Sequence, residues 1–420
     1  MAKENMSKLE ELIQQYCPDG VEWHPFFDVC DLIRGITYNK EQEAKTQADD
    51  AYKVLRANNI TLHLNILNFE DVKLVSKDVM VKPTQHLFAG DILMCAGSGS
   101  KEHVGKVAFI PENMDYTFGG FMAVVRCKDA ILPRFVYHIL TSGYFSNHLD
   151  VQINSSTINN INKQVMQSFE IPVPPLPVQE EIVRILDAFT ELQAELQAEL
   201  QKRLQQNNYY RDNLLSFEGR TDVQWKKLGD VADLLSGFPF DSSLFADNGI
   251  KLMRGVNIKR GQLCFNKTDD RYWESEKGLE KYIVNENDIV ISMDGSLVGR
   301  SFGMVKKEHL PLLLVQRVAR IRSSSANINY IYYCICNWFP DYVDKKKTQG
   351  AIPHISLKDI ANFPIPFPSL LEQQKMVEIL NHFDTLTNDL TSGLPAEIEK
   401  RRQQYEYYRD KLLTFKRKGA

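Results

Sequence analysis

The chain has 420 residues, of which 43% are hydrophobic and 25% charged, an ordinary soluble globular composition with room for roughly two to four domains. A net charge of −4 argues weakly against a nucleic-acid partner, although the distribution of charge matters more than its sum. The sequence contains no run of roughly 18 apolar residues, the length that a membrane-spanning helix needs. Its seven scattered cysteines are typical of reduced thiols in a cytoplasmic protein.

The first half of the chain reads as a short helix, a globular stretch and a long helix. We expect an N-terminal helix over residues 1–20 and a globular domain over 21–170. Prolines in residues 171–177 then predict an extended hinge, because each proline disfavours a helical conformation in the residue before it. Apolar residues at spacings of three and four follow and predict a helix through residue 217, about 40 residues or roughly 60 Å long. This stripe contains Ile182, Ile185, Phe189, Leu192, Leu196, Leu200 and Leu204.

The second half repeats this order. A globular domain is expected over residues 218–363 and a second helical segment over 364–420. Gly393 and Pro395 should break or kink that segment. Acidic residues concentrate at the start of the first long helix, where we interpret them as a solvated outer face.

Four blocks recur in the same order, which indicates a tandem duplication. Residues 23–35 and 225–237 share six of 13 positions, and residues 202–217 and 400–415 share 11 of 16. Between the shared blocks, residues 36–88 and 238–284 do not align usefully, so we interpret the domain interiors as diverged toward different targets. The long helices stayed alike, which favours one scaffold role for both.

A long helix cannot bury its own apolar stripe. The economical solution is that the two related helices pack together as a coiled coil. The alternative, in which each helix lies on its own globular domain, stays open at this stage.

The chain carries no recognisable catalytic motif. We find neither the N/D-P-P-Y/F tetrapeptide of an amino-methyltransferase nor zinc spacing among histidines and cysteines. Residues 98–106 look faintly like a phosphate-binding loop, but Ser100 replaces the first required glycine and Val107 the magnesium-binding hydroxyl residue. We therefore expect no enzyme and no cofactor in this chain; the rival reading is a self-sufficient DNA methyltransferase or nuclease.

The order of domain, proline-rich hinge and helix, given twice, resembles the specificity subunit of Type I restriction-modification systems. The carrying motifs are QEEIVRILDAF after the first hinge, YYRDNLLSF at the helix end, residues 16–23, residues 90–94, residues 155–162 and residues 350–356. The tandem ELQA turns over residues 191–201 are similar to tetrapeptide repeats in the central helix of some members.

The resemblance implies an α/β fold: two mixed α/β target-recognition domains separated by two long antiparallel coiled-coil helices, with an internal pseudo-twofold repeat. It implies that each domain reads one half of a bipartite DNA target and that the helices set the gap. The implied partners are double-stranded DNA, two methyltransferase subunits and the restriction subunits. S-adenosylmethionine, ATP and magnesium would belong to those partners.

Candidate DNA contacts come from polar, glycine-containing turns after buried strands and from basic clusters in the second domain. Glycine lets the backbone approach a phosphate closely, and arginine and asparagine suit guanine and adenine in the major groove. A plain hairpin loop or a solvated strand edge is an equally good reading of several of them. The predicted contacts are Lys101, His103, Lys106, Arg254, Asn257, Lys259, Arg300, Gln316, Arg317 and Lys346.

Paired tyrosines close both long helices at Tyr209, Tyr210, Tyr407 and Tyr408. Stacking on bases is one reading of such pairs. Their place on the helical stripe instead favours packing within the coiled coil or against a partner subunit.

Overall fold

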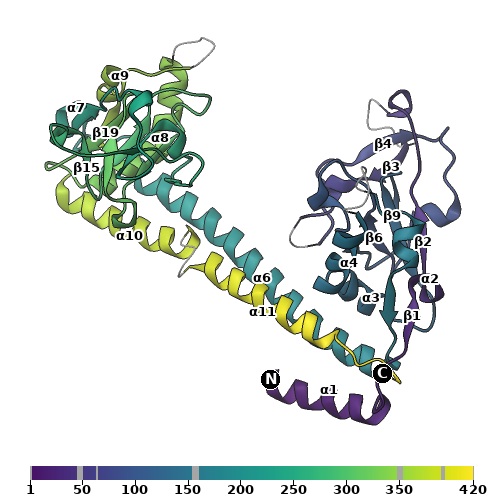
Figure 1. Ribbon diagram of the computed structural model, residues 1–420. Helices are drawn as coiled ribbons and strands as arrows, with labels where there is room; N and C mark the ends of the chain where they lie inside the picture. Colours follow the sequence, from purple (N-terminus) through teal and green to yellow (C-terminus); the bar gives the residue numbers. More distant parts are fainter. Residues whose placement is uncertain are drawn as a thin grey trace. The chain divides into compact units, whose positions relative to one another are not determined.

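The computed structural model describes residues 2–44, 51–62, 65–153, 160–347, 353–388 and 393–419 (Figure 1). The chain divides into two compact units, one of Met1–Ala198 with Ala396–Ala420 and one of Glu199–Pro395. Each division falls inside a predicted helical segment. Each unit therefore contains one globular domain together with parts of both helical segments. Within the described residues, no helix is both long and apolar enough to cross a bilayer.

The first unit contains two four-stranded sheets, ordered β2-β9-β6-β7 and β4-β3-β8-β5, and a separate β1-β10 pair. Helices α3 and α4 accompany the first of these sheets, and α1 precedes the domain (Figure 1). The elements are α1 (Ala2–Tyr16), β1 (Trp23–Pro25), α2 (Phe26–Val29), β2 (Cys30–Arg34), β3 (Ala51–Leu55), β4 (Lys73–Ser76), β5 (His86–Leu87), β6 (Ile92–Cys95), β7 (Val107–Phe109), β8 (Met114–Phe118), β9 (Met122–Cys127), α3 (Pro133–Leu140), α4 (Gly143–Ile153), α5 (Lys163–Gln167), β10 (Glu170–Pro172) and α6 (Leu176–Leu214).

The second unit repeats this topology, with sheets ordered β12-β19-β16-β17 and β14-β13-β18-β15 and a β11-β20 pair. Its elements are β11 (Gln224–Lys227), α7 (Leu228–Val231), β12 (Asp233–Ser236), β13 (Ile250–Met253), β14 (Tyr272–Trp273), β15 (Ile283–Val284), β16 (Ile289–Ser292), β17 (Phe302–Met304), β18 (Leu312–Leu314), β19 (Val318–Arg322), α8 (Ile328–Lys346), α9 (Leu357–Ala361), β20 (Pro364–Phe367) and α10 (Leu370–Asn388). Helix α11 (Leu394–Leu412) follows and belongs almost entirely to the first unit.

The domain interiors that diverge in sequence nevertheless share one backbone topology. The segments that do not align in sequence form β3, β4 and β5 in one unit and β13, β14 and β15 in the other, at matching places in the sheets. What differs is the lengths and side chains of the connections. The α/β fold with an internal repeat is confirmed.

Each domain has three layers, which are the helices, the first four-stranded sheet and the second four-stranded sheet. A central strand of the middle layer contacts both of the others. In β6, Ile92 and Met94 pack in the cluster that contains α3, whereas Leu93 and Cys95 pack against the second sheet. Successive side chains of a strand point to opposite faces, so a strand covered on both faces is apolar throughout. This explains the buried strand that the sequence predicted here and in β16.

A buried carboxylate precedes this strand in both units. Asp91 accepts two hydrogen bonds from Arg126, both of 2.7 Å, and Asp288 accepts the same pair from Arg322 at 2.7 Å. Both carboxylates are 1% exposed and also accept a backbone N–H three residues upstream. Asp91 and Asp288, which precede equivalent strands of the two units, are therefore structural, since removing one partner of such a pair leaves a buried charge uncompensated.

The glycine that ends each copy of the first shared block marks a close backbone approach. A Cβ on Gly35 would lie 2.2 Å from the carbonyl oxygen of Gly119, and one on Gly237 would lie 2.3 Å from that of Val315. We expect Gly35→Ala to destabilise the first unit by about 3 kcal/mol or more, since backbone must move to admit the methyl group. Gly99→Ala, whose Cβ would meet nothing within 4 Å, is the control. Equal unfolding midpoints for the two variants in chemical denaturation would contradict this account.

A buried glutamine fixes each hinge to the domain before it, a feature that sequence reasoning missed. Gln179 accepts a hydrogen bond from the N–H of Leu132 at 2.8 Å and donates to the carbonyl of Pro174 at 2.7 Å. Gln373 does the same with Asn327, at 3.0 Å, and Pro368, at 2.9 Å. The start of each long helix is thus attached to the helix that follows the sheet.

The two helical segments pack on each other in both units through the same pair of rings. Phe189 of α6 stacks on Tyr408 of α11 in the first unit, with centroids 5.5 Å apart. Tyr210 of α6 stacks on Phe383 of α10 in the second, with centroids 5.0 Å apart. In the second unit Asn207 of α6 also contacts Thr387 of α10, whereas Tyr210, further along α6, contacts Phe383, which comes earlier in α10. The two helices are therefore antiparallel.

The two alternatives for the helical stripe turn out to be compatible. Ile182, Ile185 and Leu186 of α6 are buried in the same cluster as the helices of the first domain and as Tyr405 and Leu412 of α11. The helix therefore packs on its own domain and on the helix of the other repeat. The predicted break near Gly393 and Pro395 falls between α10 and α11, and residues 389–392 lie outside the described residues.

The solvated outer face assigned to the acidic residues is wrong for Glu181. Its carboxylate is buried and bonds Arg184 at 2.6 Å and Lys8 of α1 at 2.8 Å. The hydrogen bonds from Arg184, first, and from Lys8 lower the pKa of Glu181 to about 2. Glu191 and Glu195 are exposed, as predicted.

His138 links the first domain to both helical segments. Its Nε2 lies 2.8 Å from Oδ1 of Asp187 on α6, and its Nδ1 lies 3.1 Å from the hydroxyl of Tyr405 on α11. The ring is fully buried, and burial lowers the pKa of His138 in spite of the neighbouring carboxylate. A neutral ring that donates from Nε2 and accepts at Nδ1 satisfies both contacts.

This lowered pKa predicts acid sensitivity of the first unit. Unfolded histidine titrates near pH ~6.5, so the unfolded state binds a proton that the folded state resists, and stability present above that pH is lost as pH falls below it. We expect His138→Gln to weaken this loss, measured by thermal unfolding at a series of pH values. The exposed His382→Gln serves as control. Equal acid slopes for wild type and His138→Gln would refute the assignment.

Candidate nucleic-acid interface

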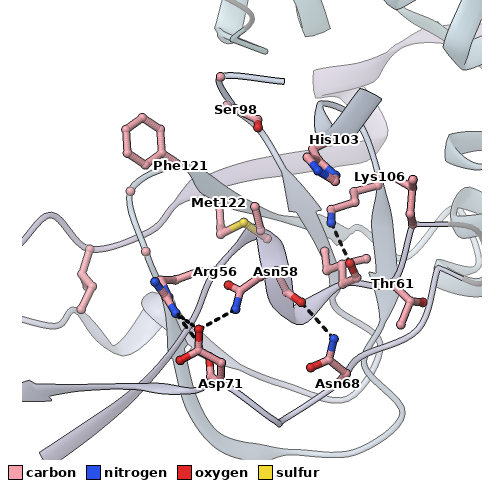
Figure 2. Close-up of a pocket in the computed structure, with 18 of the residues that line it drawn as sticks. Arg56, Asn58, Thr61, Asn68, Asp71, Ser98, His103, Lys106, Phe121 and Met122 are labelled. Atoms are coloured by element: carbon pink, nitrogen blue, oxygen red, sulfur yellow. Dashed lines mark hydrogen bonds and ion pairs between the residues drawn. The ribbon is translucent and has the colours of Figure 1, made fainter. Parts of the chain in front are cut away.

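A cleft of about 1230 Å³ opens in the first domain where the two sheets' connections meet. The connection between β8 and β9 supplies Phe121, the turn after β3 supplies Arg56 and Asn58, and the turn after β6 supplies Ser98 (Figure 2). These turns leave their strands at the same end of the domain. The cleft is therefore built from loops held by strand ends, a common arrangement for binding sites.

Polar groups on one wall of the cleft are fixed by Asp71. Its Oδ2 accepts hydrogen bonds from Arg56 at 2.7 Å and from Asn58 at 3.0 Å (Figure 2). The guanidinium is thus oriented along the wall. Neither Arg56 nor Asn58 is among the contacts predicted from the sequence.

His103 and Lys106, both predicted DNA contacts, line the opposite wall (Figure 2). Lys106 is largely buried and its Nζ donates to the carbonyl of Ile60 at 2.7 Å, while burial lowers its pKa. One of its three donors is therefore used inside the protein. Nδ1 of His103 is buried and has no hydrogen-bond partner within the described part of the chain.

The second domain has a cleft of about 370 Å³ at the matching place. Four predicted contacts line it, Arg254, Lys259, Gln316 and Arg317. The turn after β13 carries Arg254 as the turn after β3 carries Arg56. The sequence signal for this match is R-x-x-N-I, present at residues 56–60 and 254–258, which the search for repeats missed.

The asparagine of this motif holds the turn. Asn257 is 0% exposed; its Oδ1 accepts from the N–H of Arg254 at 3.2 Å and its Nδ2 donates to the carbonyl of Cys264 at 3.2 Å. Asn59 caps the equivalent turn through the N–H of Arg56 at 2.8 Å. The predicted contact of Asn257 with a base is incompatible with this structure, because the side chain has no accessible surface.

Besides Asn257, three predicted contacts lie outside both clefts. Lys101 pairs with Asp150 at 3.0 Å, Arg300 bonds Asp344 at 2.8 Å, and Lys346 lies exposed at the end of α8. Hydrogen bonds led by that from Arg300 lower the pKa of Asp344 to about 2. These cations remain candidates for contacts with the DNA backbone, and they line neither of the two clefts.

The paired tyrosines separate into two kinds. Tyr210 and Tyr408 form the ring stacks within the helices. Tyr209 and Tyr407 are 66% and 63% exposed, each edge-on to its neighbour. The second kind offers the larger surface to a partner, although Tyr210 is also 38% exposed. Among the described residues, no group of three or more histidine, cysteine, aspartate or glutamate side chains could hold a metal ion.

Comparison with known proteins agrees with this duplicated architecture. A family model described as Type I restriction modification DNA specificity domain matches residues 18–206 and again 221–400. The chain is 38% identical over 309 residues to the EcoR124I/EcoR124II specificity subunit of Escherichia coli, covering 70% of this chain and 73% of that one. It is 28% identical to the EcoKI specificity subunit of Escherichia coli K12, over 90% of this chain and 86% of that one.

Solved structures share the fold. A chain of a type I R-M system aligns with a TM-score of 0.59 and 17% identity, covering 94% of this chain and 98% of that one. The S subunit of a Type I restriction-modification system from M. genitalium aligns with a TM-score of 0.54 and 16% identity, covering 94% and 95%. With two family matches that together span most of its length, the chain belongs to the Type I restriction modification DNA specificity domain family.

Proposed function

We propose that this protein is the DNA-recognising subunit of a type I restriction-modification complex, with one half of a bipartite target read by each unit. The observation that carries the proposal is the recurrence of one cleft, at the same place in the same fold, in two units that both match the specificity family. Two related but differently lined clefts suit two different half-sites. The recognition domains proposed are residues 21–170 and 218–363.

The charges around the clefts suit DNA in spite of the net charge of −4. Lys259 and Arg317 are exposed at the second cleft, while acidic residues such as Glu191 and Glu195 lie on the helical segment. Cations gathered at the binding face attract phosphate and release counterions, whatever the charge elsewhere. Binding to duplex DNA should therefore weaken with salt; an adaptor that never touches DNA would show no such dependence.

Catalysis is assigned to partner subunits. The chain lacks the motifs of an amino-methyltransferase or phosphate-binding loop, so adenine methylation and ATP-dependent cleavage would use S-adenosylmethionine, ATP and magnesium bound elsewhere in the complex. We propose two methyltransferase subunits, one near each exposed tyrosine, Tyr209 and Tyr407, and restriction subunits beyond them. We propose that the chain acts in the cytoplasm, because its complex would act on cellular DNA. Binding of S-adenosylmethionine by the isolated chain would support the rival enzyme reading instead.

Exchanging one recognition domain tests the proposal directly. If residues 222–363 are replaced by the equivalent stretch of a relative, we expect one half of the methylated motif to change and the other half to persist. The reason is that each cleft is built within one unit. Methylome sequencing of a host that carries the chimaera and its methyltransferase is the readout, with exchange of residues 21–170 as the reciprocal control. A change in both halves would contradict independent reading.

A further inference from the structure

One residue at the mouth of each cleft, Phe121 in the first unit and Arg317 in the second, occupies an equivalent position, as its backbone hydrogen bonds show. The carbonyl of Phe121 accepts hydrogen bonds from the N–H groups of Ala96 and Gly97, both at 2.9 Å. The carbonyl of Arg317 accepts one from Met293 at 2.8 Å. Both residues lie in the connection between equivalent strands, β8 and β9 or β18 and β19, and both line their cleft.

The two side chains at this position differ in chemistry, and each is in an unusual setting for its residue type. Phe121 is 74% exposed at the rim of the cleft, where its ring points away from the loop that carries it (Figure 2). Arg317 is 61% exposed and has φ of 69°, in the left-handed region that favours glycine. A side chain kept where glycine would be less strained indicates a role for that side chain.

The residue that follows the neighbouring strand, β6 or β16, also differs between the units, and it matches the side chain at this position. Asp294 follows β16 and bonds Nη1 of Arg317 at 3.0 Å, which orients the guanidinium at the cleft. Its equivalent is Gly97, where a Cβ would lie only 3.3 Å from Cδ1 of Phe121. The first unit thus pairs glycine with phenylalanine, and the second pairs aspartate with arginine.

We infer that this shared position reads a base edge in each half-site, Arg317 a guanine and Phe121 the methyl group of a thymine. The inference rests on the proposed function. A phosphate would be bound by a cation in both units and disfavoured by the carboxylate of Asp294, whereas base edges offer both acceptors and an apolar group. Guanine presents two acceptors to arginine in the major groove, and the thymine methyl suits an apolar ring.

Base analogues test both halves without disturbing the protein. The complex with its methyltransferase subunit is used, on a duplex that carries the methylated motif found by methylome sequencing. Replacing one thymine of the first half-site by deoxyuridine removes only the methyl group and should weaken binding about fourfold. Replacing one guanine of the second half-site by 7-deazaguanine removes an acceptor and should weaken it about tenfold. Phe121→Ala should abolish the first effect alone, and Arg317→Gly the second alone.

The variants carry their own folding control. Arg317→Gly relieves the left-handed conformation, so the unit should unfold at an equal or higher temperature while recognition is lost. Val151→Ala, another exposed apolar residue of the first unit, and Lys277→Ala, an exposed cation of the second, should leave both analogue effects intact.

Three outcomes overturn the inference. The first is that no analogue effect depends on Phe121 or Arg317. The second is that Arg317→Gly weakens binding to every sequence alike and lowers the salt dependence by about one ion, as for a phosphate contact. The third is that duplexes with 2-aminopurine become brightly fluorescent only with Phe121, as for a ring inserted between bases. Failure of the wild-type complex to bind its own motif would instead refute the proposed function.

Discussion

Deleting Glu195–Ala198 should shorten the gap between the two half-sites by one or two base pairs and leave both half-site sequences unchanged. The deletion removes one Glu-Leu-Gln-Ala turn of α6. Four helical residues correspond to roughly 6 Å and about 40° beyond a full turn. One base pair of B-DNA rises about 3.4 Å. Mapping of methylated sites in a host carrying the variant measures the change.

The deleted turn contributes no residue to either cleft, so the deletion tests spacing alone. It ends where the two units divide, and Glu195 and Ala198 are exposed. Duplicating the turn should lengthen the gap by the same amount, and replacing Glu195 by glutamine at constant length should leave it unchanged. An altered half-site with an unaltered gap would disprove a spacing role for α6.

Ending the chain after Lys411 should selectively destabilise the first unit, although its recognition domain is several hundred residues away in sequence. Leu412 and Leu413 are buried in the core of that unit and Phe415 packs against it. The burial of these side chains stabilises by about 1.5–3 kcal/mol each, so their loss should cost several kcal/mol. Hydrogen exchange on the full-length and shortened chains measures where protection falls.

Backbone pairing adds to this effect. The N–H of Val21 donates to the carbonyl of Lys416 at 2.8 Å, and the N–H of Lys418 donates back to Val21 at 3.0 Å. Replacing Arg417 and Lys418 by alanine is the control, because it removes side-chain contacts, the exposed pairs with Glu170 and Glu22 and the contact of Arg417 with the Trp23 ring, and leaves the backbone pairing in place. Equal loss of protection in both units after truncation would argue against this assignment.

The sequence predicted the long-range organisation better than the binding surface. Duplication, hinges, helical segments and the buried strands around Ile92 and Ile289 follow from local patterns, because periodicity and proline act within a few residues. The matching of β3 with β13 could not be predicted in this way. The connections around those strands differ in length and composition, and only pairing with distant strands reveals that they are equivalent.

The site depended on distances that the sequence does not contain. Lys101 and Lys106 appeared equivalent as basic residues of one turn, but one is paired outside the cleft and the other is buried in its wall. Phe121 was not predicted, because a lone phenylalanine reads as core until its exposure is known. Asn257 was predicted as a reader of adenine, whereas its amide caps a buried turn.

The division of the chain into two units also affects the order in which they can fold during synthesis. Residues 199–395 form a continuous stretch, so the second unit can fold as soon as the ribosome has released it. The first unit, although translated earlier, lacks α11 and the final strand-like segment until residues 396–419 emerge. While residues 187–395 are being made, Ile182 and Leu186 of α6 therefore lack the α11 residues of their cluster, Tyr405 and Leu412.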